Sequence, residues 1–163
     1  LLRRMRRWGD GDRFSALVDR IRLREPEATL RSNFIVGYPG ETEEDHDKLL
    51  EFVANIKLDW CGFFAFSEEV ETYAAGLDGA VPKGLVVERL RELSELQDTI
   101  TASKREELIG REVEVLVDEV GWGRTYREAP EIDGLVGVPM HLPVGEFATL
   151  TVTSAAGPDL EAA

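Results

Sequence analysis

Two short polar segments, each placed directly after an apolar stretch, hold the residues with the clearest chemical potential. The first reads Gly37-Tyr38-Pro39-Gly40-Glu41 and the second reads Ser67-Glu68-Glu69. Gly37 and Gly40 lack a Cβ, so the backbone there can adopt a positive φ and approach a ligand closely. Thr42 stands at the expected start of a helix, whose free N–H groups could face a carboxylate or a phosphate. The same residues also suit an ordinary tight turn, so the pattern alone leaves both interpretations open.

The histidines, the cysteine and a group of glutamates form no catalytic pattern of their own. His46, on the surface of a predicted helix, and His141 are far apart in the chain, and neither has the base or nucleophile that a catalytic triad needs. Cys61 lies among aromatic residues and is interpreted as a small buried hydrophobe. The glutamates of residues 68–71 could bind a cation through their oxygens, although a solvated loop explains them better. We therefore expect no metal site and no catalytic residue in this chain.

The elements that position these segments alternate between helix and strand over the first part of the chain. Residues 29–37 and 60–66 are rich in β-branched and aromatic side chains and predict two buried strands. Between them, Thr42 as N-cap and Asp45 three residues later predict a capped helix. Two strands joined by a helix form a right-handed parallel βαβ unit, preceded here by an amphipathic helix that ends before Pro26.

The pattern changes after a long predicted helix, residues 85–108. Gly110 ends this helix, and short alternating segments separated by Gly and Pro follow, as in a small antiparallel barrel or sandwich. The predicted strands are residues 112–118, 134–138 and 147–153. Upstream, two strands make an incomplete sheet, because parallel sheets are covered on both faces and their edges are protected. We expect the upstream part to be a piece of a larger α/β fold, and a start at Leu1 rather than Met fits this.

Composition narrows the choice of partners. The chain has 163 residues, with 32 acidic against 19 basic side chains, a net charge of −13 and one cysteine. Such an acidic protein is poorly suited to a phosphate backbone, and one cysteine supplies neither a disulfide framework nor a cluster site. Residues 1–31 carry nine basic and five acidic groups, and their start LLRRMRR could meet an anion or form a solvated helix face. No apolar run is long enough to predict a membrane span.

Taken in order, several segments resemble the radical-SAM methylthiotransferases. They are LLRRMRR with the helix after it, RSNFIVGYPGETEED, FFAFSEEVETYAA, VPKGLVVERLRELSELQDTI and IGREVEVLVDE, and the likeness continues to GPDLEA near the end. The stretch GRTYREAPEIDG resembles one branch, the RimO type, which adds a methylthio group to an aspartate of the small-subunit ribosomal protein S-twelve. The tRNA-modifying, MiaB-like branch lacks the APEIDG part.

The resemblance implies a fold, cofactors and a partner. Residues 1–107 would form the last βα units of a partial radical-SAM (βα) barrel, and residues 108–163 a small antiparallel β-barrel, the TRAM domain. The complete enzyme would use S-adenosylmethionine and 4Fe–4S clusters, and would be a cytoplasmic monomer. In that enzyme, the strand ends at residues 32–37 and 64–67 would line the S-adenosylmethionine pocket. The single residues implied at this site are Arg31, Ser32, Gly37, Pro39, Gly40, Glu41, Ser67 and Glu69.

The charge of the second domain supports the choice of branch. Residues 108–163 carry ten acidic and three basic groups, a net charge of −7, which suits a basic ribosomal protein better than tRNA. We therefore expect the TRAM domain to dock the protein substrate. The residues assigned to that surface are Arg124, Glu128, Glu131 and Asp133.

The chain also departs from the family. The cysteines that ligate the family's clusters are absent, so these residues alone would not perform the radical chemistry. The family's loop Tyr-Ser-x-Glu-x-Gly-Thr has Phe66 and Glu71 in place of the Tyr and the Gly, and a right-handed turn at Glu71 would alter the loop. Two alternatives remain open: a non-catalytic module that binds a ribosomal protein, and a fragment of a tRNA-modifying enzyme.

Overall fold

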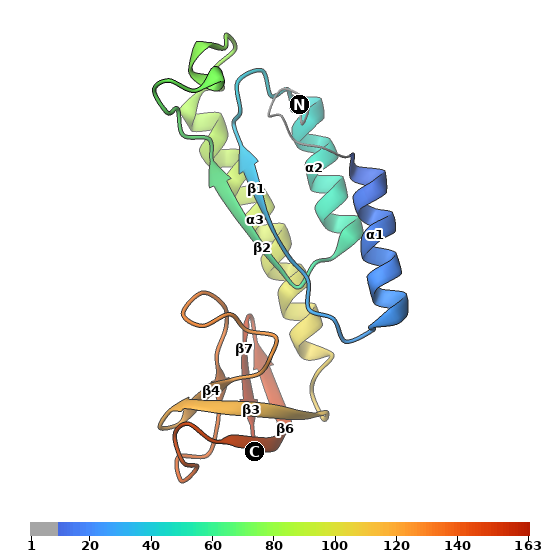
Figure 1. The fold of residues 1–163 in the computed structure, drawn as a ribbon, viewed down its shortest axis with the longest axis vertical. Coiled ribbons are helices and arrows are strands. Elements are labelled where there is room, and N and C mark those ends of the chain that lie inside the picture. Colours follow the sequence, from blue (N-terminus) through green and yellow to red (C-terminus); the bar gives the residue numbers. More distant parts are fainter. Residues whose placement is uncertain (1–9) are drawn as a thin grey trace. The chain divides into compact units, whose positions relative to one another are not determined.

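The computed structural model describes residues 10–163 (Figure 1). The Arg-rich start, for which an anion contact or a solvated helix face is expected, lies outside the described residues. The chain forms two compact units that divide between Gln97 and Asp98. This division falls inside a continuous helix, α3 (Lys83–Glu106), and the boundary expected at 107/108 stays a prediction.

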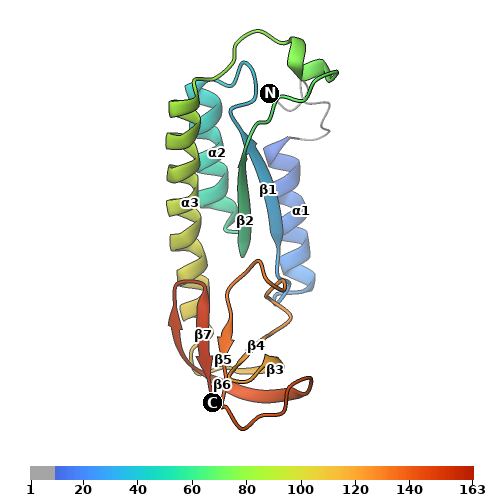
Figure 2. The ribbon, with the colours of Figure 1, turned by 90° about the vertical axis from the view of Figure 1, so that its left-hand side faces the viewer.

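The first unit is built around a pair of parallel strands. Its elements before α3 are α1 (Gly11–Arg24), β1 (Arg31–Val36), α2 (Glu43–Ile56), β2 (Trp60–Ala65) and the 3₁₀ turn η1 (Tyr73–Gly76). β1 and β2 pair in parallel from Arg31↔Trp60 to Val36↔Ala65, which confirms the predicted βαβ unit. Figure 2 shows the two strands side by side, with α1 and α2 beside them. The ends of both strands therefore meet at one edge, where ligands of α/β proteins usually bind.

Buried side chains join the helices of this unit to its strands. Val18 of α1, Ile56 of α2 and Leu58 form one apolar cluster, with Phe52 and Cys61 packed against it. Burying one such aliphatic side chain contributes roughly 1.5–3 kcal/mol. This packing holds α1 and the C-terminal end of α2 against the strands.

The start of α2 has the capping box that the sequence predicts. The Thr42 hydroxyl accepts a hydrogen bond from the Asp45 N–H at 3.1 Å, and the Asp45 carboxylate accepts one from the Thr42 N–H at 3.1 Å. The Thr42 N–H is the main cause that holds the pKa of Asp45 below its usual value. Both hydrogen bonds satisfy N–H groups that have no partner within the helix backbone.

We expect Asp45→Asn to lower the free energy of unfolding by about 1 kcal/mol at neutral pH. Because the pKa of Asp45 is lowered on folding, its contribution is present above the unfolded pKa and is lost as the pH falls through the folded value. Thermal unfolding between neutral and strongly acidic pH should show the difference from the parent chain shrinking in acid. Asp47→Asn, on the exposed side of the same helix, is the control and should leave stability unchanged.

The second unit contains a closed five-stranded barrel. Its strands are β3 (Glu112–Glu119), β4 (Trp122–Arg124), β5 (Val136–Gly137), β6 (Phe147–Ala156) and β7 (Asp159–Ala162), in the order β3-β4-β5-β7-β6. Alternate residues of β3 point inward, as the predicted alternation requires. The buried core consists of Leu108, Val113, Val115, Val117, Val136, Val138, Val152, Leu160 and Ala162.

The expectation of a purely antiparallel barrel is wrong, because the barrel is mixed. β5 pairs with β7 in parallel, with Val136 opposite Leu160 and Gly137 opposite Glu161. β5 has only two residues, and β7, at the end of the chain, inserts between β5 and β6 and so closes the barrel. Closure removes the exposed strand edges that three predicted strands would leave unpaired.

No helix within residues 10–163 is long and apolar enough to cross a membrane.

Candidate functional site

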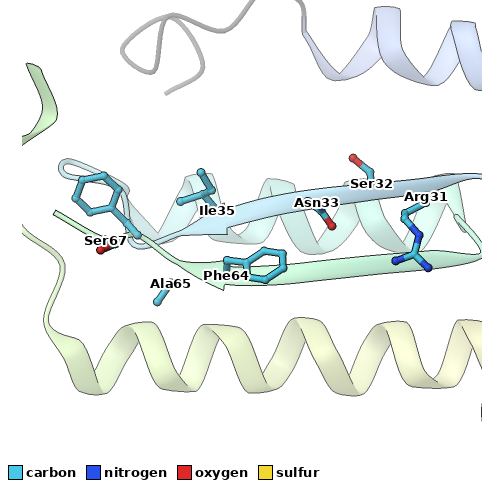
Figure 3. Close-up of a pocket in the computed structure, with 8 residues that line it drawn as sticks. Arg31, Ser32, Asn33, Ile35, Phe64, Ala65 and Ser67 are labelled. Atoms are coloured by element: carbon cyan, nitrogen blue, oxygen red, sulfur yellow. The ribbon is translucent and has the colours of Figure 1, made fainter. Parts of the chain in front are cut away.

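A groove of about 750 Å³ runs along β1 and the end of β2 (Figure 3). Figure 3 shows Arg31 and Ser32 pointing to opposite sides of β1, as successive strand residues do. The residues that line the groove are Arg31, Ser32, Asn33, Ile35, Phe64, Ala65, Phe66 and Ser67. The groove thus combines a guanidinium, a hydroxyl and a carboxamide with aromatic walls.

The structure brings three of the expected cofactor residues, Arg31, Ser32 and Ser67, to this groove. The remaining lining residues lie in the two strand ends, residues 32–37 and 64–67, that the resemblance implies around the S-adenosylmethionine pocket. On β1, Asn33 and Ile35 follow Arg31 at alternate positions and so share a face with it. The other expected residues belong to the two loops at the strand ends.

The first loop, residues 37–41, is a tight turn with glycines in the left-handed region. Gly37 and Gly40 both have a φ of 84°, and a Cβ on Gly37 would lie 2.5 Å from a Val86 methyl carbon. The Gly40 N–H donates to the Gly79 carbonyl at 2.7 Å. Glycine is therefore required at Gly37 both by conformation and by the close approach of α3.

Glu41 holds this loop in place. Its buried carboxylate accepts the Gly37 N–H at 2.8 Å and an Arg89 guanidinium N–H at 2.7 Å. Arg89 lies on α3, is only 2% exposed and also donates to Glu43 at 2.8 Å. This bond is the main cause that lowers the pKa of Glu43. A cofactor contact for Glu41, which the resemblance implies, stays a prediction; in the structure its carboxylate accepts hydrogen bonds from Gly37 and Arg89.

The second loop, residues 66–72, follows β2. The Phe66 ring packs edge-to-face against Tyr38 of the first loop, with ring centroids 5.1 Å apart. The Ser67 hydroxyl donates to the Glu69 carboxylate at 3.1 Å, and the Thr72 hydroxyl donates to the Glu69 carbonyl at 2.8 Å. The glutamates of residues 68–71 are exposed, and within residues 10–163 no group of His, Cys, Asp or Glu is arranged to hold a metal ion.

Glu71 has a φ of 74°, so the expected right-handed turn is wrong. The residue keeps the left-handed conformation that glycine would adopt, at a cost of about 1–2 kcal/mol for a side chain that has a Cβ. Glu71 thus adopts a conformation that glycine would adopt without this strain.

We expect Glu71→Gly to raise the free energy of unfolding by about 1 kcal/mol, because glycine adopts the left-handed region without this strain. Chemical denaturation would measure the change. Glu68→Gly is the matched control: Glu68 is exposed on the same loop but has no positive φ, so glycine there should not stabilise the chain. Equal effects of the two substitutions would refute the role of strain at Glu71.

The surroundings of Cys61 and of His46 are typical of structural residues rather than of catalytic ones. Burial raises the pKa of the partly buried Cys61 thiol to about 12, which makes it a poor nucleophile. As the single cysteine of the chain, it does not supply the several thiolates that a cluster needs. His46 is 2% exposed, so its expected place on the helix surface is wrong; its Nε2 lies 2.8 Å from a Glu92 carboxylate oxygen. His46 precedes Leu49 and Val53 at helical spacing, and this signal could have predicted its burial.

In the second unit, Glu128 is buried, not on the surface where the sequence analysis placed it. Its carboxylate pairs with the Arg105 guanidinium from the end of α3, and both side chains are almost fully buried. It also accepts the Thr125 N–H at 2.6 Å and the Thr125 hydroxyl at 2.7 Å. These three donors offset the free energy that the carboxylate loses when it is removed from water, and so permit its burial.

The other three assigned residues lie closer to solvent. Arg124 donates to Asp118 at 2.5 Å, and both side chains are about a third exposed. Asp133 accepts the Ala129 N–H at 2.7 Å. Glu131 is exposed and has a φ of 62°.

Comparison with known proteins identifies a family for the barrel and relatives for nearly the whole chain. A family model described as a TRAM domain matches residues 109–163, which include the whole barrel. The ribosomal protein uS12 methylthiotransferase RimO of Cutibacterium acnes is 42% identical over 167 aligned positions that cover 99% of this chain. The chain is homologous to the C-terminal part of RimO.

Other RimO sequences match in the same way. RimO of Akkermansia muciniphila is 41% identical over 99% of the chain, and RimO of Moorella thermoacetica is 44% identical over 94%. The chain spans about a third of the length of these relatives: 35% for the Cutibacterium protein and 36% for the other two. The expected family resemblance is therefore confirmed.

Proposed function

We propose that this chain supplies the C-terminal part of a RimO-type radical-SAM methylthiotransferase whose substrate is ribosomal protein uS12. The observation that carries the proposal is the identity of 41–44% to RimO sequences over nearly the whole chain. In this proposal the first unit is a segment of a radical-SAM barrel, and its open parallel pair continues into strands from the rest of the enzyme. The complete protein would work in the cytoplasm.

The groove along β1 suits S-adenosylmethionine chemically. That cofactor, cleaved at a reduced 4Fe–4S cluster, supplies the radical in this class of enzyme. Arg31 would pair with its carboxylate, and Asn33 and Ser67 offer side chains for its other polar groups. Ser32, on the opposite side of β1 (Figure 3), would contribute through its backbone. Phe66 would keep water from the groove.

The loops at the strand ends would complete this site. Gly37, Pro39 and Gly40 lie in the first loop, where the backbone can approach a ligand closely, and Glu41 fixes their position. Glu69 would act in the second loop by orienting Ser67. A cluster needs several cysteine ligands and this chain has only Cys61, so we place no cluster on it and expect it to be inactive alone.

The TRAM unit would dock the protein substrate. With ten acidic and three basic groups in residues 108–163, it attracts a basic protein and repels a phosphate backbone. The same charge argues against a tRNA-modifying role, because RNA affinity comes largely from neutralised phosphates.

Calorimetric titration of the full chain with purified uS12 and, separately, with an unmodified tRNA tests this role. We expect saturable binding of uS12 that weakens as salt is raised, and no binding of tRNA at the same concentrations. Binding of tRNA without binding of uS12 would contradict the proposal and favour the tRNA-modifying branch.

A further inference from the structure

In one loop of the TRAM unit, residues 125–135, two carboxylates accept hydrogen bonds from within the protein. Buried Glu128 joins it to Arg105 and caps the N–H and hydroxyl of Thr125. Two of the acidic residues expected to contact a partner, Glu128 and Asp133, are therefore engaged within the protein. We call this segment the 125–135 loop.

Further hydrogen bonds hold the second half of the loop. Asp133 accepts the Ala129 N–H at 2.7 Å, and the Ile132 N–H donates to the Ala129 carbonyl at 3.3 Å. At the far end, the Leu135 N–H donates to the Asp159 carboxylate at 2.8 Å, which ties the loop to β7. A loop with this many bonds loses little conformational freedom when it binds a partner.

The side chains that the loop presents to solvent are mainly apolar. Tyr126 is 64% exposed, Ile132 is 71% exposed and Leu135 is 45% exposed. The Arg127 guanidinium lies 4.4 Å from the centre of the Tyr126 ring, which stabilises the ring's position. Tyr and Arg are enriched among the residues that dominate binding energy in protein interfaces.

We propose that the 125–135 loop is the surface that contacts the basic protein substrate, and that Tyr126, Ile132 and Leu135 supply the binding energy. The inference rests on the proposed function and deepens it. The net charge of −7 over residues 108–163 attracts the partner at long range, and Glu131 is the exposed carboxylate beside the apolar contacts. Charge would set the association rate, and the apolar side chains would set the dissociation rate of the complex.

The test compares exposed apolar residues on two parts of the same unit. Tyr126→Ser and Ile132→Ser alter the loop, whereas Val120→Ser and Met140→Ser alter equally exposed side chains near the β3–β4 turn. We measure the Kd and association rate for purified uS12 with the full chain, at low and high salt. Thermal unfolding confirms that each variant is folded, which is expected because all four side chains are exposed.

We expect the Tyr126/Ile132 double variant to bind uS12 about tenfold more weakly or worse, through faster dissociation, at both salt concentrations. The control variants should bind within about twofold of the parent chain. Glu131→Lys should instead slow association, and high salt should remove its effect.

Each remaining outcome is decisive. Loop variants that bind like the parent chain would overturn the inference and leave the proposed function intact. Loss of binding only in the Val120 and Met140 variants would place the contact surface at the β3–β4 turn and would also overturn it. If the parent chain binds no uS12, the proposed docking function fails, and the inference fails with it.

Discussion

Glu128→Ala is expected to lower the free energy of unfolding of the TRAM unit by about 3–5 kcal/mol, because it leaves the buried Arg105 charge without its partner. The carboxylate also accepts two hydrogen bonds from Thr125, whose donors would be left unsatisfied. Urea denaturation, followed by the fluorescence of Trp122 in this unit, would measure the loss.

Two further variants separate the buried pair from a general effect of charge removal. Asp118→Ala breaks the partly exposed pair with Arg124 and should cost no more than about 1 kcal/mol. Replacing both members of the buried pair, Arg105→Met with Glu128→Leu, should recover part of the stability, because the unpaired charge at residue 105 is removed while the two Thr125 donors still lack their acceptor. If Glu128→Ala lowers the free energy of unfolding no more than Asp118→Ala does, the buried Glu128 carboxylate does not stabilise the TRAM unit as we expect.

Arg89→Met should have an effect of similar size in the first unit. It would leave the buried carboxylate of Glu41 without its cation, at a cost of about 3–5 kcal/mol. Because the same carboxylate accepts the Gly37 N–H, the loop at the end of β1 should also loosen. Hydrogen exchange at the Gly37 and Gly40 amides would report that loosening, and denaturation would report the stability.

Arg91→Met is the matched control on the same helix. Arg91 pairs with Glu95 at 2.7 Å, but both side chains are more than half exposed, so its loss should cost less than about 1 kcal/mol. It should leave amide exchange at Gly37 unchanged. Faster exchange in both variants would mean that the helix, rather than Arg89, controls the loop.

The predictable part of the fold is the part that depends on neighbouring residues. The capping box at Thr42 needs only Asp45 three positions away, and the helices and longer strands follow from their own apolar spacing. β7 was missed because its four residues carry little pattern, and its place in the barrel depends on partners distant in sequence. Glu71 was mispredicted because the sequence shows a side chain but not the backbone strain that the loop accepts.

Two carboxylates show which features of the site depend on residues distant in sequence. The resemblance implies a cofactor contact for Glu41, and Glu128 is expected at the docking surface, yet each carboxylate pairs with an arginine of α3. Those arginines, Arg89 and Arg105, lie 48 and 23 residues away in sequence. Local sequence patterns do not reveal such pairs. A carboxylate that pairs with a buried arginine therefore cannot be distinguished by sequence pattern from one that binds a ligand.

We propose that this chain is functionally equivalent to the C-terminal third of RimO. To test this, the chain is joined in frame to the preceding part of Moorella thermoacetica RimO, and methylthiolation of uS12 and of tRNA is followed by mass spectrometry. We expect the chimera to modify uS12 and to leave tRNA unmodified. A folded chimera that cleaves S-adenosylmethionine but leaves uS12 unmodified, while native Moorella RimO modifies it, would contradict the claim.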